Sequence, residues 1–257
     1  MKPHIQTAAL LLVLARADLA LAGLISVNNL SGQIQSSAQA VDFISNTDSS
    51  PPPNLISFGR ADNPFNLGVT SSAAAGSATA NSSAAQNWSF SLDPDSFDLT
   101  ASGNVRGGTA IEYRNNRATT TANSGFAFGI YIDQAFSYSL SIQTSLQGGG
   151  PSVQGYTEVT FGGRQPFAFA GNGGYSHPVE PTSLSISGIL PAGSYELDAV
   201  LGIGIQSGYS LLTSNGASGI ADYTVTFHAT TVVPEPGTAL FGIACVGVSA
   251  FRRRRRA

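Results

Sequence analysis

Between residues 120 and 230, apolar and polar residues alternate with a period of two. Ser124 to Asp133 places Phe126, Phe128, Ile130 and Ile132 on one face and small or polar residues on the other. Successive side chains of a strand point to opposite faces, so this alternation predicts half-buried β-strands. The same pattern predicts further strands at Phe136–Leu146, Tyr156–Phe161, Thr182–Ile189, Ser194–Gln206 and Ala221–Thr230.

Two short connections in this region have the composition of hairpin turns. Asp133-Gln134-Ala135 is short enough to join two neighbouring antiparallel strands. The segment from Ile189 to Tyr195 reads Ile-Leu-Pro-Ala-Gly-Ser-Tyr and resembles a hairpin entry found in many secreted bacterial sandwiches. We therefore expect a hairpin at each place.

Before residue 120 the alternation is weaker. Residues 86–92 and 96–102 are predicted to pair across Asp93-Pro94-Asp95. Residues 69–85 are nearly all Ser, Ala, Gly, Thr and Asn, and are either an exposed strand or a mobile loop. Ser49–Asn54 contains three consecutive prolines and is expected to be a loop.

The complete pattern predicts an all-β fold with eight to ten short strands separated by Gly-rich turns. We expect one antiparallel β-sandwich of the jelly-roll kind, spanning residues 23–230 as a single domain. The sequence contains no repeat of fixed period.

Composition supports strands and excludes one class of partner. Only 11% of the residues are charged, against about 25% in an average soluble domain. Residues 23–233 hold five arginines, no lysine and thirteen acids, a net charge of −8. Phosphate backbones are bound by clustered basic side chains, so we expect no nucleic-acid partner. The one cysteine, Cys245, lies near the C-terminus, so no disulfide supports the domain.

The first 22 residues have the features of a signal peptide. Lys2 precedes a short apolar run, Ala8–Leu14, and small-x-small cleavage sites end at Ala17 and at Ala22. Cleavage at either site fits the pattern. The alternative is a buried N-terminal helix. A membrane span is not expected here, because seven apolar residues are too few for one.

The last residues, 231–257, form a three-part tail. Pro234-Glu235-Pro236 cannot be helical, because each proline lacks an amide donor and restricts the residue before it. Thr238–Phe251 is an uncharged apolar stretch of 14 residues, about 21 Å long as a helix and short for a hydrocarbon core of about 30 Å. The five arginines Arg252, Arg253, Arg254, Arg255 and Arg256 follow, and they favour the cytoplasmic side.

This order of motif, apolar helix and arginine cluster resembles the PEP-CTERM sorting signal of Gram-negative and related bacteria. The resemblance implies recognition by an exosortase, a membrane protease-transpeptidase that cleaves near the motif. Family members are typically surface or matrix proteins of bacteria that make exopolysaccharide. An ordinary single-pass anchor is the alternative, but the short span favours a temporary anchor that is removed. The resemblance covers the tail alone.

One acidic cluster suggests a cation site. Asp93, Asp95 and Asp98 supply three carboxylates within six residues, and Ca²⁺ prefers oxygen ligands. The alternative is an acidic β-turn, in which aspartate is favoured by turn geometry. No other cofactor is expected.

Motifs of catalysis are missing from the sequence. His228 is expected to face solvent, and His177 has no second histidine or cysteine at zinc-ligand spacing. No nucleophile elbow accompanies either histidine, and Gly202-Ile203-Gly204 fits a strand better than a nucleotide loop. The sequence does not show whether any of the glutamates meet as a glycosidase pair, namely Glu112, Glu158, Glu180 or Glu196.

Exposed aromatic residues can bind sugars by stacking. Trp88 is more consistent with a core position, and the tyrosines in Gly-rich surroundings are Tyr113, Tyr156, Tyr175 and Tyr209. We therefore expect a non-enzymatic surface or matrix protein, exported through the inner membrane, which contacts exopolysaccharide or copies of itself. The alternative is a secreted carbohydrate-binding module or carbohydrate-active enzyme that uses the same route.

Overall fold

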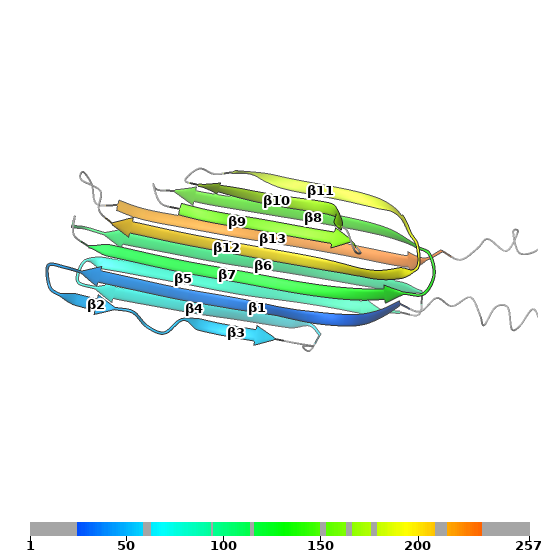
Figure 1. The fold of residues 1–257 in the computed structure, drawn as a ribbon, viewed down its shortest axis with the longest axis horizontal. Helices are drawn as coiled ribbons and strands as arrows, with labels where there is room; N and C mark the ends of the chain where they lie inside the picture. The colour runs from blue at the N-terminus through cyan, green and yellow to red at the C-terminus, as the bar shows by residue number, and fades with distance from the viewer. Residues whose placement is uncertain are drawn as a thin grey trace, which may run out of the picture.

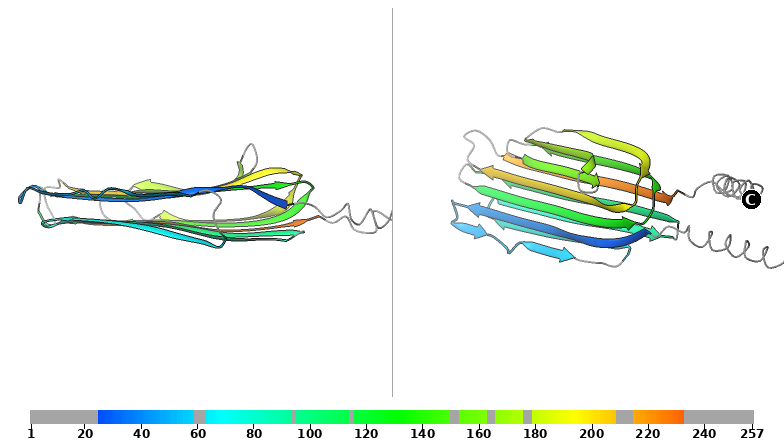
Figure 2. Two further views of the ribbon diagram at one scale, coloured as in Figure 1. Left: turned by 90° about the horizontal axis from the view of Figure 1, so that it is seen from below. Right: turned by 45° about the vertical axis from the view of Figure 1, so that its right-hand side comes forward.

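The chain forms two packed antiparallel sheets (Figures 1 and 2). The computed structural model describes residues 25–58, 63–93, 95–113, 116–149, 153–162, 166–175, 179–208 and 215–232. Sheet A runs in the order β10 (Pro166–Tyr175), β9 (Val153–Gly162), β12 (Gly193–Gly208), β7 (Arg117–Ile132), β1 (Ile25–Asp42) and β2 (Thr47–Ser49), with β3 (Asn54–Phe58) also on β1. Sheet B runs in the order β11 (Val179–Leu190), β8 (Phe136–Gly149), β13 (Asn215–Thr231), β6 (Ser96–Ile111), β5 (Ala78–Leu92) and β4 (Phe65–Ala75). The predicted β-sandwich is confirmed.

The strand order is that of a jelly roll with two extensions. Strands β6 to β13 lie as β6-β13-β8-β11 in sheet B and as β7-β12-β9-β10 in sheet A, so early and late strands interleave in both sheets. Strand β1 with β2 and β3 extends sheet A beyond β7, and the hairpin of β4 and β5 extends sheet B beyond β6.

Both predicted hairpins in the second half are wrong. Residues 133–135 join β7 of sheet A to β8 of sheet B, and residues 191–192 join β11 of sheet B to β12 of sheet A. Each connection is therefore an arch between the two sheets. The sequence pattern could not separate the two cases, because a strand keeps one apolar face whether its neighbour lies beside it or across the core. At the second arch, the Tyr195 hydroxyl donates to the Pro191 carbonyl over 2.7 Å.

The number and length of strands also differ from the prediction. The described residues form thirteen strands, and eleven of these have ten residues or more. The predicted turn between residues 92 and 96 is confirmed, since Asp93 and Ser96 exchange backbone hydrogen bonds. Residues 69–85 form most of the hairpin of β4 and β5, and β1 was not predicted at all.

The core changes character along the strands, and β7 shows this in one row of side chains. Its inward residues run Ala118, Thr120, Ala122, Ser124, Phe126, Phe128, Ile130 and Ile132, and all are buried. At the end near the arches, which we call the aromatic end, rings pack together; Trp88 stacks on Phe65 with centroids 3.7 Å apart, and Phe97 stacks on Phe128 at 5.4 Å. At the opposite end, which we call the alanine end, the core cluster consists of Ala38, Ala40, Ala73, Ala75, Ala78, Ala80, Ala118 and Ile111.

Buried hydroxyls join the two sheets beside the alanine end. Ser82 of β5 donates to the Ser37 carbonyl of β1 over 2.8 Å, and its hydroxyl lies 2.7 Å from that of Ser36. Thr120 of β7 donates to the Asn81 carbonyl of β5 over 3.0 Å. Because a short side chain of one sheet reaches the backbone of the other, the sheets approach closely here.

The turns of the alanine end are fixed by Asp42. Its carboxylate accepts a hydrogen bond from the Ile44 amide over 2.8 Å. It also lies where a side chain of Gly76 would be, since a Cβ there would lie 1.7 Å from Asp42 Oδ2. Gly76 has a φ of +53°, so glycine is favoured at this turn both by conformation and by space.

Both termini of the described domain lie at the aromatic end. Ile25 pairs with Ile132 at the first arch, and the Val232 amide donates to the Ala135 carbonyl of the same arch over 3.1 Å. The predicted signal peptide and the sorting tail from residue 233 onward lie outside the described residues. Within the described residues, no helix has the length and apolar character needed to cross a membrane.

Candidate ligand-binding surfaces

The predicted calcium cluster does not come together as a metal site. Within the described part of the chain, no group of three or more His, Cys, Asp or Glu side chains is close enough to hold a metal ion. Asp93 and Asp95 lie at the turn between β5 and β6, where Asp93 accepts a hydrogen bond from Ser96. Asp98 lies on β6, 2.6 Å from Nδ1 of His228 on β13. The structure thus matches the acidic-turn alternative.

Other predicted residues are placed as follows. Trp88 is 2% exposed and belongs to the core, and the His228 side chain faces solvent, so both expectations are confirmed. Glu112 and Tyr113 are exposed at the alanine end, away from Glu158 and Glu196 on sheet A. His177 and Tyr209 lie outside the described residues, as do the side chains of Tyr175 and Glu180.

The outer face of sheet A carries an exposed aromatic ring supported by a glycine. Tyr156 of β9 is 45% exposed and pairs directly with Gly202 of β12. A Cβ on Gly202 would lie 2.3 Å from Cε1 of Tyr156 and 2.9 Å from Oδ1 of Asn123 on β7. The ring therefore lies against the Gly202 backbone, with an amide at its edge. We call Tyr156, Gly202, Asn123 and the neighbouring Val200 the tyrosine platform.

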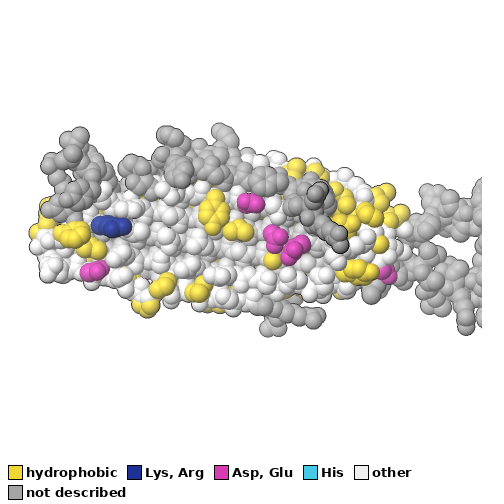
Figure 3. Space-filling model, in the orientation of Figure 1, with side chains coloured by type: hydrophobic (Ala, Val, Ile, Leu, Met, Phe, Trp, Pro, Cys, Tyr) yellow, Lys and Arg dark blue, Asp and Glu magenta, His cyan; other side chains and the backbone are white. Residues whose placement is uncertain are grey.

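Carboxylates flank the tyrosine platform. Glu158 pairs directly with Val200, and Asp198 follows two positions along β12 on the same face. Burial raises the pKa of Asp198, and the negative charge of Glu196 raises it further. In Figure 3 acidic side chains gather near the middle of this face, close to hydrophobic ones. The surface offers an apolar ring beside several hydrogen-bond acceptors.

A shallow depression continues this face toward the aromatic end. It has a volume of about 480 Å³ and is lined by Asn28, Asn29, Gly129, Gly162, Ser194, Tyr195 and Glu196. The register of β1 against β7 shifts between Val27 and Asn29. This shift places two asparagine side chains next to Gly129, whose added Cβ would lie 2.5 Å from Asn28 Oδ1.

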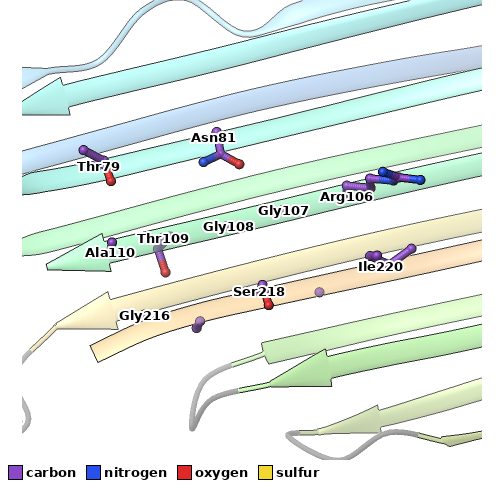
Figure 4. Close-up of a pocket in the computed structure, with 12 residues that line it drawn as sticks. Thr79, Asn81, Arg106, Gly107, Gly108, Thr109, Ala110, Gly216, Ser218 and Ile220 are labelled. Atoms are coloured by element: carbon purple, nitrogen blue, oxygen red, sulfur yellow. The ribbon is translucent and has the colours of Figure 1, made fainter. Parts of the chain in front are cut away.

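The outer face of sheet B has a groove of about 530 Å³ over β5, β6 and β13 (Figure 4). Its outward residues stand in cross-strand rows, because Asn81, Gly108 and Ser218 are paired, as are Thr79, Ala110 and Gly216. In these two rows the middle strand β6 carries only Gly108 and Ala110 outward, so its surface lies lower than that of β5 and β13. We call this depression the glycine groove.

Arg106 closes one end of the glycine groove, next to Ile220. Its Nε donates to Oδ1 of Asn104 over 3.0 Å, which orients the guanidinium. Among the described residues no carboxylate lies within ion-pair distance of it. Among the described residues that line the groove, Arg106 is the only charged one.

The sequence named Tyr156, Glu158 and Glu196 among its candidates but missed their companions. Gly202 was correctly assigned to a strand, yet its role under the tyrosine ring needs the register of β9 against β12. Arg106 and Gly108 carry no local motif, and the groove around them needs the pairing of β6 with β13, which lies more than 100 residues further along the chain. An arginine within a Gly-rich strand of an arginine-poor domain was the available signal.

No protein-family profile matches the chain, and no curated protein sequence matches it. Among solved structures, the tailspike protein 4 enzymatic domain of bacteriophage CBA120 aligns at TM-score 0.21 and 11% identity, over 56% of this chain. The chain spans about a fifth (19%) of that tailspike chain. A structure of infectious bursal disease virus aligns at TM-score 0.20 and 11% identity, and the alignment covers 82% of this chain and 63% of the viral chain. The structure of TmCBM61 in complex with β-1,4-galactotriose aligns at TM-score 0.19 and 12% identity, and the alignment covers 62% of this chain and 86% of TmCBM61. TM-scores this low support no functional conclusion.

Proposed function

We propose that this is an exported bacterial surface or extracellular-matrix protein whose sandwich binds polysaccharide without cleaving it. The tyrosine platform carries the binding part of the proposal. The exposed Tyr156 ring offers an apolar surface to the flat face of a pyranose. Glu158, Asp198 and Asn123 around it can accept hydrogen bonds from sugar hydroxyls.

The export part rests on the sorting tail. Pro234, Glu235 and Pro236 would be read by an exosortase while the arginines 252–256 hold the end of the chain in the cytoplasm. The protein would pass from the inner membrane to the cell surface or matrix. Because both termini of the described domain lie at the aromatic end, an attachment there leaves both outer faces accessible.

The platform is tested with Tyr156→Ala and Gly202→Ala, using affinity electrophoresis in gels containing soluble neutral β-glucan, galactan or mannan. Tyr156→Ala should weaken retardation by about 2- to 12-fold, the range of an aromatic contact. Gly202→Ala keeps the tyrosine but displaces its ring, and should weaken binding similarly. Tyr131→Ala is the control, since Tyr131 is 43% exposed on the same sheet. Equal retardation of all four proteins would refute the platform.

The export route is tested separately. Glu235→Ala should abolish processing when the protein is expressed with a matching exosortase, and the mass of the mature product reports this. Unchanged processing would mean that the tail is an ordinary anchor.

One observation favours the alternative of a sugar-active enzyme. Asp198 has a raised pKa beside Glu196, as a general acid of a glycosidase does. These two side chains, however, project from the same strand on an open face and do not oppose each other across a cleft. A reducing-sugar assay on the same glycans decides the matter, since release that disappears in Asp198→Asn would establish the enzyme.

A further inference from the structure

The glycine groove lies on the opposite outer face from the tyrosine platform, so one ligand segment cannot occupy both. From Ala110 to Arg106 it runs four residues along β6, about 13 Å at the rise of a strand. Its floor is backbone at Gly108 and Gly216, and its sides carry hydroxyls and an amide from Thr79, Ser218 and Asn81. This length and lining suit two or three linked sugar rings.

The chemistry of the groove differs from that of the platform in charge. Of its lining residues in the described part of the chain, only Arg106 is charged, and the Nε of Arg106 donates a hydrogen bond to Asn104. The terminal guanidinium nitrogens face no carboxylate of the described residues within 4 Å. A planar guanidinium binds a carboxylate through two parallel hydrogen bonds.

We propose that the glycine groove is a second saccharide site, selective for sugars that carry a carboxylate, such as the uronic acids of an acidic polysaccharide. Arg106 binds the carboxylate, while Asn81 and Ser218 bind ring hydroxyls. The inference rests on the proposed function only in taking a polysaccharide as the ligand, and it needs no contribution from Tyr156.

The charge of the protein sets a limit on this site. The domain carries a net charge of −8, and Asp222 lies one cross-strand row beyond Arg106, paired with Asn104. Asp222 accepts a hydrogen bond from Ser145 on the side away from β6. Charges beyond about 8 Å are largely screened at physiological salt, so among the described acids Asp222, the nearest to Arg106 in the strand register, has the largest effect on Arg106. Neutralising it should strengthen anion binding.

The experiment is a calorimetric or NMR titration of the mature domain with three probes: a galacturonic acid trimer, a galactose trimer and acetate. The acidic trimer should bind, and Arg106→Gln should weaken it at least 10-fold. Arg117→Gln is the matched control, because Arg117 is an exposed arginine on sheet A. The affinity of this variant for the acidic trimer should stay within twofold of the wild-type value. Asp222→Asn should strengthen binding about 2- to 3-fold.

The Ala110→Leu variant tests independently whether the acidic trimer binds in the glycine groove. Ala110 is exposed, so a leucine there fills the groove without disturbing the core. This variant should also bind the acidic trimer more weakly. Equal binding of both trimers, or an unchanged affinity in Arg106→Gln, would overturn the proposal. Binding of acetate as tight as that of the trimer would reduce the site to a simple anion site and overturn its sugar part.

Failure here and failure of the proposed function give different results. If the groove proposal alone fails, Tyr156→Ala still changes retardation in neutral glycans. If the platform alone fails, the Tyr156→Ala variant still binds the acidic trimer, and Arg106→Gln still weakens that binding at least 10-fold.

Discussion

The aromatic end and the alanine end of one sandwich are held together by different forces. At the aromatic end, Trp88, Phe97 and Phe128 are buried between the sheets and contact further rings. At the alanine end, side chains of one carbon face each other, and the adjoining hydroxyls of Ser82 and Thr120 bond to the backbone of the opposite sheet. The first end gains mainly from apolar burial, and the second from close approach and paired polar groups.

This difference explains how such long strands can be built from so few large residues. Apolar burial scales with area, so the aromatic end supplies most of the hydrophobic stabilisation. The alanine end buries little area per residue, but Ala, Ser and Thr lose little side-chain entropy on ordering. The glycine groove lies over this thinner part, since Thr79 and Ala110 alternate with the buried Ala78, Ala80 and Ile111.

The largest effect is expected from Trp88→Ala at the aromatic end. Trp88 is 2% exposed and contacts the rings of Phe58, Phe65 and Phe126. Its removal leaves a large cavity and should lower the free energy of unfolding by about 3–5 kcal/mol, measured by urea denaturation. Phe43→Ala is the control, because Phe43 is 60% exposed, and it should change stability by less than about 0.5 kcal/mol. A loss for Trp88→Ala no greater than that of the control would contradict the division into two ends.

A gain of volume should be harmful between the sheets at the alanine end and harmless on the outer face there. Ala80→Leu places a large side chain where the sheets approach closely, and should cost about 1–3 kcal/mol through overpacking. Ala74→Leu is the matched control, since Ala74 lies on the adjacent strand β4 and is exposed. If both variants unfold at the same urea concentration as the wild type, the sheets are not tightly packed at this end.

The hydroxyl contacts should have a smaller effect. Ser82→Ala removes a donor to the Ser37 carbonyl and a partner of Ser36. Both groups keep another bond, because Thr120 also donates to Ser37 and Ser36 also donates to the Ser82 carbonyl. We therefore expect a loss of only about 1 kcal/mol, the net value of one hydrogen bond. Ser72→Ala, an exposed serine on β4, should be neutral in the same urea titrations; a comparable loss in both would show that the buried bond adds nothing.

The contrast between the ends also decided what could be predicted from the sequence. Inward rows containing Phe126, Ile142 or Phe227 alternate strongly with polar residues, and the strands around them were predicted close to their true positions. In the halves of β1 and β4 at the alanine end, residues 36–40 and 71–75, the inward row is alanine and serine opposite an outward row of serine, glutamine and alanine. These residues differ little in hydropathy, so a real strand there gives almost no periodic signal.

Apart from the hairpin of β5 and β6, the pairing between strands could not be predicted from the sequence, for a separate reason. Nothing local distinguishes the arch at residues 133–135 from a hairpin, and the register of β9 on β12 follows from the whole jelly roll. Tyr156 could therefore be named as a candidate, while Gly202 and Asn123 beneath and beside it could not. The same holds for Arg106, because its groove needs β13 beside β6, and the paired residues of these two strands are more than 100 positions apart.

The smallest expected effect is a pH dependence at the turns of the alanine end. Burial of Asp42 opposes its ionisation, but hydrogen bonds from the amides of Ile44 and Ser45 outweigh it and lower its pKa. The stability that this carboxylate contributes is present above its unfolded pKa of about 4, and is lost as the pH falls through the lower folded value. Asp42→Asn should therefore destabilise the protein at pH 7, with a difference from wild type that shrinks toward pH 3.

The measurement is urea unfolding of both proteins at pH 7, 5 and 3, and the quantity compared is their difference at each pH. Asp198 titrates in the opposite sense, since its raised pKa means that stability is gained as the pH falls toward its unfolded value. Both proteins contain Asp198, so its contribution cancels in the difference. A difference that stays constant from pH 7 to pH 3 would show that the turn depends on the shape of the Asp42 side chain and not on its charge. The alanine end would then be held by packing and neutral hydrogen bonds alone.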